Sequence, residues 1–321
     1  MGLLTGIKVL DVTYYLPGPN AAMRLAKMGA TVIKVEPPKG DPAKTLSAGI
    51  VHEANNRGKD IVTIDLKSSE GQQVMRELIE TADVLIESFR PGVMKRLGFS
   101  YEAVKKLKPD MVYCSMTGYG HQSPLVNFGS HDINYMALSG MLSQLIDEEE
   151  NPVSPKNTIA DYVGALHATE GILAALVNKL KTGEGAFVDI AIADAMLSFQ
   201  GTHLAYLDSG ISEHGIPEID GTRIAYGIYR TKDNRHVALG ALEPKFWDNL
   251  CHFANRPDWE AIAMNKKGIV EHEEVSRFFE KYTWDEWLEI SLRTDFCVTP
   301  VMHISELPQH PHWQLKALSV H

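Results

Sequence analysis

Strand and helix patterns alternate along the chain up to about residue 209, and no other feature restricts the fold as strongly. Strands separated by helices at this spacing form a mostly parallel sheet that the helices cover. Ligands of such sheets bind at the carboxyl ends of the strands. The loops after Val12, Glu36, Ile86 and Met116 are therefore expected to carry function. The expected strands lie at 7–12, 30–36, 61–66, 84–86 and 111–116, with helices at 20–28 and 68–82.

Three further elements complete this region. The clearest helix pattern spans 161–180, where apolar residues recur at helical spacing. A strand at 187–191 and a helix at 194–208 follow. Aspartate is a preferred N-cap residue, so Asp161 and Asp194 are the expected N-caps of the two helices.

A second, smaller domain is expected after a polar, glycine-rich stretch at 209–221. Beyond it, paired strand patterns at 225–231 and 236–242 are followed by helical patterns, which is typical of an α+β domain. The fold prediction is an α/β large domain with a mostly parallel sheet, joined to a smaller α+β domain. The expected divisions are 1–209 for the large domain, 210–224 for a linker and 225–300 for the small domain.

Charge and cysteine usage argue against several function classes. A formal net charge of −10 makes nucleic acid an improbable partner. No apolar run approaches the length of a membrane span, and residues 1–9 do not resemble a secretory signal. Cys114, Cys251 and Cys297 lie far apart, lack metal-ligand spacing and fit a reducing cytoplasm.

Basic residues recur near the expected strand ends, although neither a Walker A pattern nor G-x-G-x-x-G follows the first strand. In an acidic chain, a basic cluster at the ligand edge of a sheet indicates phosphate contacts. The alternative interpretation is scattered, solvated charge. The residues concerned are Lys34, Lys39, Lys44, Arg57, Lys59, Arg90, Lys95 and Arg96.

Three titratable residues are candidates for proton chemistry. His131 and Asp161 are of the two types that commonly exchange protons near neutral pH. A carboxylate at a helix start is expected to stay ionised, and the N–H groups there can stabilise an oxyanion. Glu243 follows an expected strand and precedes a helix. Each has a structural alternative: an ordinary surface histidine, a helix N-cap and a capping or surface carboxylate.

At these residues the chain resembles the family III CoA-transferase superfamily, and within it the α-methylacyl-CoA racemases. Single segments are moderately specific, but their order along the chain is highly specific. The superfamily segments are PGP at 17–19, GATVIKVE at 29–36, NRGK at 56–59 and FRPGV at 89–93. The racemase-like segments are HDINY at 131–135 and GALEPKF at 240–246. His131 separates the two groups, because the transferases usually lack it and keep the aspartate.

This resemblance implies a Rossmann-like large domain, a small domain and an interlocked homodimer whose active sites each use both chains. It implies an acyl-CoA thioester substrate that carries coenzyme A, with no tightly bound cofactor and no metal. Glu243 is expected to come from the partner subunit and to lie near His131. The implied residues are His131, Asp161 and Glu243 for catalysis, Asn157 and Tyr226 for substrate, and Lys59, Arg90 and Arg96 for CoA.

The chain departs from the family pattern in two places. Relatives often have an arginine where this chain has Pro37, and Lys39 is expected to replace it as a CoA contact. Relatives also continue past the position of His321 and return to the large domain. We expect residues 301–321 to be the short start of that return.

The resulting hypothesis is epimerisation at C2 of a 2-methylacyl-CoA thioester. His131 would exchange the proton on one face of C2 and Asp161 on the other, with the enolate oxygen held at the helix start and Glu243 orienting His131. One alternative is a CoA transferase that forms an aspartyl-CoA thioester on Asp161. A second alternative is an acyl-CoA-binding protein without catalytic activity.

Overall fold

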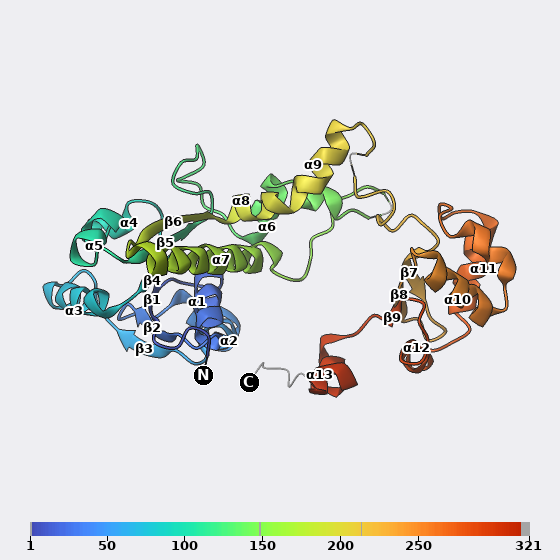
Figure 1. The fold of residues 1–321 in the computed structure, drawn as a ribbon, viewed down its shortest axis with the longest axis horizontal. Coiled ribbons are helices and arrows are strands. Elements are labelled where there is room, and N and C mark those ends of the chain that lie inside the picture. The colour runs from blue at the N-terminus through green and yellow to red at the C-terminus, as the bar shows by residue number, and fades with distance from the viewer. Residues whose placement is uncertain (1, 148, 213, 316–321) are drawn as a thin grey trace. The chain divides into compact units, whose positions relative to one another are not determined.

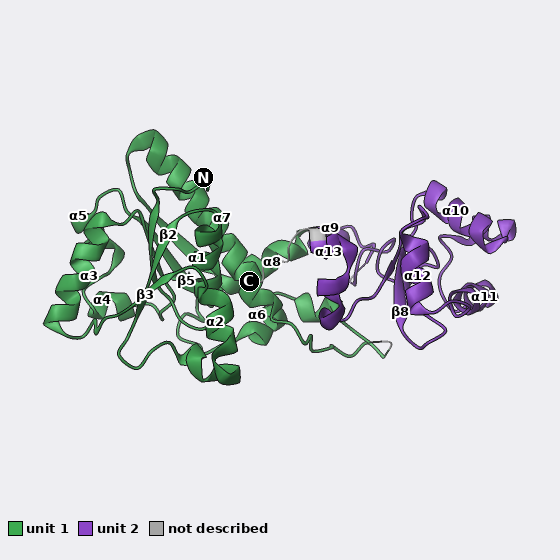
Figure 2. Cartoon of the chain, turned by 90° about the horizontal axis from the view of Figure 1, so that it is seen from below, with its two compact units in different colours: residues 1–201 green, residues 202–321 purple. Residues whose placement is uncertain are grey.

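The computed structural model describes residues 2–147, 149–212 and 214–315, in two units. One unit spans residues 1–201 and the other spans 202–321 (Figure 2). The second unit therefore starts at the beginning of α9 (Gly201–Asp208), upstream of the linker expected at 210–224. Residues 316–321 of the expected return segment lie outside the described residues.

A six-stranded sheet forms the centre of the first unit (Figure 1). The strand order is β3-β2-β1-β4-β5-β6, and every neighbouring pair is parallel. This is the order of a Rossmann-like sheet, so the fold prediction is confirmed. The strands are β1 Lys8–Val12, β2 Thr31–Glu36, β3 Asp60–Thr63, β4 Val84–Glu87, β5 Val112–Thr117 and β6 Ala186–Ala191.

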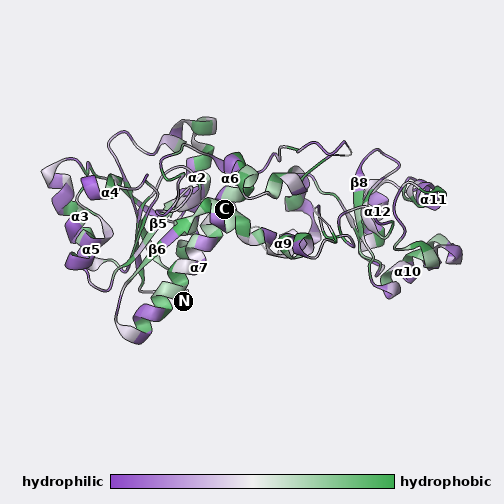
Figure 3. Ribbon diagram, turned by 90° about the horizontal axis from the view of Figure 1, so that it is seen from above, coloured by the Kyte–Doolittle hydropathy of each residue, from purple (hydrophilic) through white to green (hydrophobic). Residues whose placement is uncertain are grey.

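Helices pack on both faces of this sheet because successive strand residues point to opposite faces. Val9 packs in a core with residues of α1 and α7, whereas Leu10 packs in a second core with residues of α3 and α5. Helix α7 carries hydrophobic and hydrophilic residues (Figure 3), with Ala168 and Ile172 buried. The helices are α1 Pro17–Lys27, α2 Ile50–Asn56, α3 Ser69–Thr81, α4 Val93–Arg96, α5 Tyr101–Leu107, α6 Asp132–Leu138, α7 Ile159–Thr182 and α8 Ile192–Leu197.

Two expected N-caps are wrong. Helix α7 begins at Ile159 with Thr158 as N-cap, so Asp161 is the third helical residue. Helix α8 begins at Ile192 after Ala191, which places Asp194 in the first turn. Acidic residues favour the first turn as well as the cap, because the helix dipole stabilises negative charge throughout that turn. The sequence pattern alone could not separate these positions.

The second unit has the expected α+β architecture around its own core. Strands β7 (Tyr226–Arg230) and β8 (His236–Gly240) pair antiparallel, as predicted. A third strand, β9 (Val298–Pro300), pairs with β8 and was too short for the sequence pattern to indicate. Its core contains three buried tryptophans, and its remaining helices are α10 Pro244–Ala254, α11 Val270–Phe279, α12 Trp284–Ser291 and α13 Pro311–Leu315.

A helix that crosses a lipid bilayer must be long and predominantly apolar. Within the described ranges, no helix combines the length and apolarity that a membrane crossing would require.

Candidate active site

A buried ion network lies beneath the carboxyl ends of β1 and β2. The ammonium group of Lys59 lies 2.7 Å from Asp11 Oδ2 and also donates to the carbonyl of Pro19 and the side chain of Asn56, both at 2.8 Å. Lys34 lies 3.1 Å from Asp41 and 3.8 Å from Asp11. Burial alone would raise the pKa of Asp11, but the charges of Lys59 and Lys34 outweigh it and lower that pKa.

This network changes the interpretation of Lys59. Its side chain is fully buried and its ammonium group has three internal acceptors. Burial lowers the pKa of Lys59, and the charge of Asp11 opposes that shift. Lys59 of the NRGK segment thus ties β1 and the start of α1 to the chain ahead of β3. A CoA contact of Lys59 stays a prediction.

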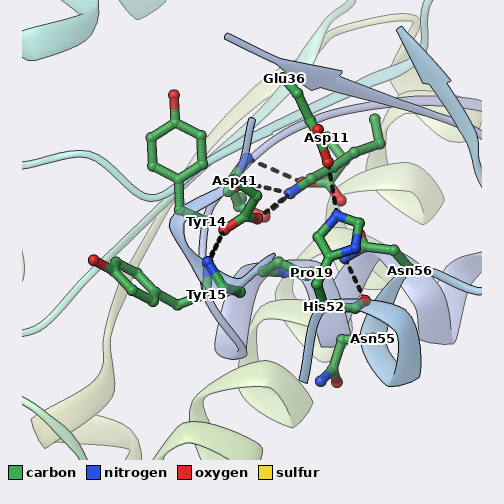
Figure 4. Close-up of polar contacts among 12 residues, drawn as sticks. Asp11, Tyr14, Tyr15, Pro19, Glu36, Asp41, His52, Asn55 and Asn56 are labelled. Carbon is green, nitrogen blue, oxygen red and sulfur yellow. Dashed lines mark hydrogen bonds and ion pairs between the residues drawn. The ribbon is translucent and has the colours of Figure 1, made fainter. Parts of the chain in front are cut away.

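Asp41 and Glu36 extend the network to the segment that follows β2 (Figure 4). Asp41 accepts hydrogen bonds from the backbone N–H groups of Tyr15, at 3.1 Å, and Ala43, at 2.9 Å. Glu36 lies 2.7 Å from His52 Nε2 and pairs with Lys44. The GATVIKVE segment therefore supplies residues that position the loops at the ligand edge of the sheet.

A pocket of about 430 Å³ lies at the carboxyl end of β2. Lys39, which sequence analysis selected, lines it together with Lys67, which sequence analysis missed. Lys67 follows the third expected strand, so the rule that ligands bind after strand ends could have found it. Tyr14 also lines the pocket, and burial together with the charges of Asp41 and Glu36 raises its pKa to about 12. The phenol therefore stays protonated at neutral pH and can donate a hydrogen bond.

Arg90 lies in the turn between β4 and α4, and Arg96 lies in α4. Both residues are exposed. Arg90 reaches the loop ahead of His131, because a Cβ on Gly129 would lie only 3.3 Å from its Nη2 atom. The predicted CoA contact Arg90 is thus close to the HDINY segment. Arg96 lies at the last residue of α4.

Helices α6 and α7 bring the HDINY segment and Asp161 together. Asp132 Oδ1 accepts the backbone N–H of Asp161 at 2.9 Å. His131 is the exposed N-cap residue of α6, and its backbone N–H donates to Asn134 Oδ1 at 3.0 Å. Asn157 is exposed and directly precedes the N-cap of α7. These residues, separated by about thirty positions, share one region of the first unit.

The electrostatics of Asp161 differ from the sequence-based expectation. Burial and, second, the negative charge of Asp132 raise the pKa of Asp161 to about 7. At neutral pH this carboxyl is therefore only partly ionised, because these two effects oppose the stabilisation by the helix start. The backbone N–H of Asp161 also already has Asp132 as its acceptor, so this group is not free to hold an enolate oxygen.

Glu243 and Tyr226 belong to the second unit. Glu243 is the exposed N-cap residue of α10, and its side chain makes no capping hydrogen bond. Tyr226 starts β7 and pairs with Gly240 of β8, so it adjoins the GALEPKF segment. His131 and Asp161 belong to the first unit. Across the described ranges, no group of three or more potential ligands could hold a metal ion.

Comparison with known proteins identifies a matching family and several relatives of this chain. The sequence pattern of CoA-transferase family III matches residues 4–321. Human alpha-methylacyl-CoA racemase is 34% identical over 323 residues, which cover 96% of this chain and 80% of the relative. Succinate–glutarate CoA-transferase of Agrobacterium fabrum is 31% identical, with 99% and 84% covered. The crystal structure of a CAIB/BAIF family protein from Brucella suis superposes with a TM-score of 0.84 at 25% identity, over 98% and 88% of the two chains.

Proposed function

The chain belongs to CoA-transferase family III, and from this premise we propose that it is a racemase acting at C2 of 2-methylacyl-CoA thioesters. The observation that carries the proposal is the 2.9 Å hydrogen bond from Asp161 N–H to Asp132, because it joins the HDINY segment to Asp161. A second support is the pKa of Asp161, raised to about 7, which lets one carboxyl both accept and donate a proton near neutrality.

The proposed reaction moves one proton off C2 and another onto its opposite face. Asp161 or His131 takes the proton, and the electron pair of the C–H bond delocalises onto the thioester oxygen as an enolate. The other residue then donates a proton to C2, which restores the carbonyl with inverted configuration. Neither a metal nor a redox cofactor takes part in this scheme.

We place the phosphates of coenzyme A at the pocket after β2 and along the β4–α4 turn. Lys39 and Lys67 line that pocket, and Arg90 and Arg96 present exposed guanidinium groups at the turn. Basic side chains at the carboxyl end of a parallel sheet suit a phosphorylated ligand. Asn157 and Tyr226 are proposed as contacts of the acyl part.

The proposal also includes a homodimer in which Glu243 of the partner subunit orients His131. Exposed apolar side chains support an interface, because they are costly to leave in water; Leu204 and Leu207 of α9 are each about half exposed.

Light scattering should give the mass of a dimer. Co-expression of inactive His131→Ala and Glu243→Ala chains should restore partial activity, because one site of each hybrid dimer keeps both residues.

Deuterium incorporation tests the reaction. The protein is incubated in deuterated water with a single enantiomer of a 2-methylacyl-CoA, across short, branched and aryl-propionyl acyl groups. Deuterium at C2 together with loss of chirality is expected. His131→Ala should abolish the loss of chirality, whereas His252→Ala, at an exposed histidine at the end of α10, should change neither signal. Wild-type protein that shows neither exchange nor racemisation on any of these thioesters excludes the proposal.

A CoA transferase is the second candidate, and the coverage of a succinate–glutarate CoA-transferase over 99% of the chain favours it. The Asp161 carboxylate would attack the thioester carbonyl and expel CoA thiolate, leaving a mixed anhydride. The thiolate would then attack the aspartyl carbonyl, releasing the carboxylic acid and leaving aspartyl-CoA. Mass spectrometry separates the candidates: a CoA adduct on Asp161 supports transfer, and exchange without an adduct supports racemisation. His131→Ala should only weaken transfer.

If the protein binds CoA but shows neither racemase nor transferase activity, it is an acyl-CoA-binding protein without catalytic activity. Calorimetry with a non-hydrolysable acyl-CoA ether measures that affinity directly. The location we propose is a reducing compartment such as the cytoplasm, supported by free thiols at Cys114, Cys251 and Cys297.

A further inference from the structure

A second pocket of the first unit, about 400 Å³ in volume, lies apart from the residues assigned to proton transfer. Its lining includes Glu87, Tyr113, Phe187 and Asp189 of strands β4, β5 and β6. Arg90 lines it from the β4–α4 turn. Among the predicted CoA contacts, it shares Arg90 alone.

A polar row crosses the sheet at this pocket. Strand register pairs Glu87 of β4 with Ser115 of β5, and Ser115 with Asp189 of β6. A parallel sheet covered by helices normally carries apolar residues at such positions, and burying polar groups there costs free energy. Glu87 is only 4% exposed and Ser115 is fully buried. Asp189 lies on the edge strand β6 and is exposed, and both Asp189 and Glu87 line the pocket, so the row ends where a ligand can contact it.

Hydrogen bonds hold the row in a fixed geometry. The hydroxyl of Ser115 donates to Glu87, and His121 Nε2 lies 2.8 Å from the same hydroxyl oxygen. The backbone N–H of Phe89 donates to Glu87 at 2.8 Å, and that of His121 donates to Asp189 at 3.1 Å. Two carboxyl groups are therefore preorganised on neighbouring parts of one pocket wall.

The negative charges of Glu87 and Asp189 on this pocket wall are not fully balanced by positive charge. Burial raises the pKa of Glu87 to about 7; the hydrogen bonds from Ser115 and Phe89 lower it, and the negative charge of Asp189 adds to the rise. A cation beside the two carboxyl groups would relieve both effects, because an opposite charge favours the ionised form. The pocket is thus suited to a ligand that carries a positive charge.

Aromatic and basic side chains define the rest of the ligand. The ring of Phe187 is 38% exposed and packs against Tyr101, Tyr113 and His121 at centroid distances of 5.2, 5.8 and 5.5 Å. A partly exposed aromatic face beside carboxylates is a good environment for an ammonium group. Arg90 offers a guanidinium group that suits a carboxylate.

We propose that this pocket binds a small ammonium carboxylate of the ω-amino acid class. The ammonium group lies between Glu87 and Asp189, over the ring of Phe187, and the carboxylate pairs with Arg90. His131, Asp161 and Glu243 do not line the pocket, so the ligand would not contact the residues proposed for proton transfer, but it would share Arg90 with the proposed CoA site.

Isothermal titration calorimetry tests the proposal on the full-length protein. The probes are glycine, β-alanine, γ-aminobutyrate and 5-aminovalerate, with butyrate and n-butylamine as analogues that each carry one of the two charges. At least one amino acid should bind saturably, and both single-charge analogues should bind at least about tenfold more weakly. The best chain length reports the separation of the two charged ends.

Variants complete the test. Asp189→Asn should weaken binding about tenfold or more, whereas Asp194→Asn, at an exposed aspartate of α8 outside the pocket, should not change it. Phe187→Leu provides a second variant that keeps the carboxyl groups, and it should also weaken binding. The proposal is overturned if no amino acid binds, if butyrate binds equally well, or if Asp189→Asn binds like wild type. C2 deuterium exchange by the same preparations tests the racemase proposal separately.

Discussion

Asp161 and Asp132 illustrate how two residues set each other's chemistry. Asp132 holds the backbone N–H of Asp161 and also contributes, after burial, to the high pKa of its side chain. A single neighbour thus holds the backbone of Asp161 by a hydrogen bond while opposing the ionisation of its side chain. For proton transfer this is useful, because a group is an efficient acid and base when its pKa lies near the working pH.

The raised pKa makes stability depend on pH. Asp161 has a usual pKa of 3.8 and a folded value of about 7, so folding takes up a proton within that window. The stabilising contribution is complete below the unfolded value and is lost as pH rises through the folded one. Asp161→Asn cannot ionise, so it should be more stable than wild type at pH 8, by on the order of 4 kcal/mol, and nearly equal to it at pH 4.

Thermal unfolding from pH 4 to pH 8 measures this difference. Asp194→Asn is the matched control, because Asp194 is an exposed aspartate in the first turn of α8. Its difference from wild type should stay constant across the range. A pH-independent difference for Asp161→Asn would show that the carboxyl titrates at an ordinary pKa.

The loops at the ligand edge are held by ion pairs between elements. Lys59 precedes β3 and binds Asp11 of β1, and Lys34 of β2 pairs with Asp41 after it. Removing one member of a buried pair leaves an uncompensated charge, which costs more than the pair itself contributes. The superfamily segments around Lys34 and Lys59 therefore serve the architecture of the edge.

Replacing Lys59 should destabilise the first unit. Lys59→Met leaves the buried Asp11 with Lys34 at 3.8 Å, and we expect a loss of about 3 kcal/mol in the free energy of unfolding. Lys44→Met is the control, because Lys44 is 45% exposed and its partner Glu36 keeps His52. Its loss should be about 1 kcal/mol or less.

Chemical denaturation measures both losses, and a double-mutant cycle isolates the pair. Asp11→Asn combined with Lys59→Met should lose less stability than the sum of the single changes. Additive losses would mean that Lys59 contributes through packing alone.

Each of the two units of the molecule has its own hydrophobic core, so we expect the two units to unfold separately. Trp287 is fully buried in the second core, and its indole N–H donates to the carbonyl of Phe279 at 3.0 Å. Trp287→Ala should destabilise the second unit by about 4 kcal/mol. Trp313→Ala is the control within that unit, because Trp313 is partly exposed in α13.

Hydrogen exchange followed by mass spectrometry resolves the two units by peptide. In Trp287→Ala, peptides from β8 and α11 should lose protection while those from β1 and β4 keep it. Equal loss of protection in both sets would show one cooperative unit instead.

Sequence analysis succeeded where the signal was local. The six strands of the sheet are apolar runs, and their parallel arrangement follows from the helices between them. It failed where partners come from afar: Lys59 meets Asp11 across 48 positions, and Asp161 meets Asp132 across 29. Burial of a lysine or a raised carboxyl pKa depends on such pairings, so neither is visible in a local pattern.

The position of β6 at the edge of the sheet affects how the nascent chain folds during translation. It is the last strand of the sheet along the chain, it pairs with β5 alone, and α7 precedes it. A nascent chain can assemble the first five strands before residues 186–191 leave the ribosome, and β5 then presents an open edge. Such an edge recruits other strands. The edge of β5 stays open while residues 118–185 are translated, so a chaperone that covers it during this interval would reduce aggregation.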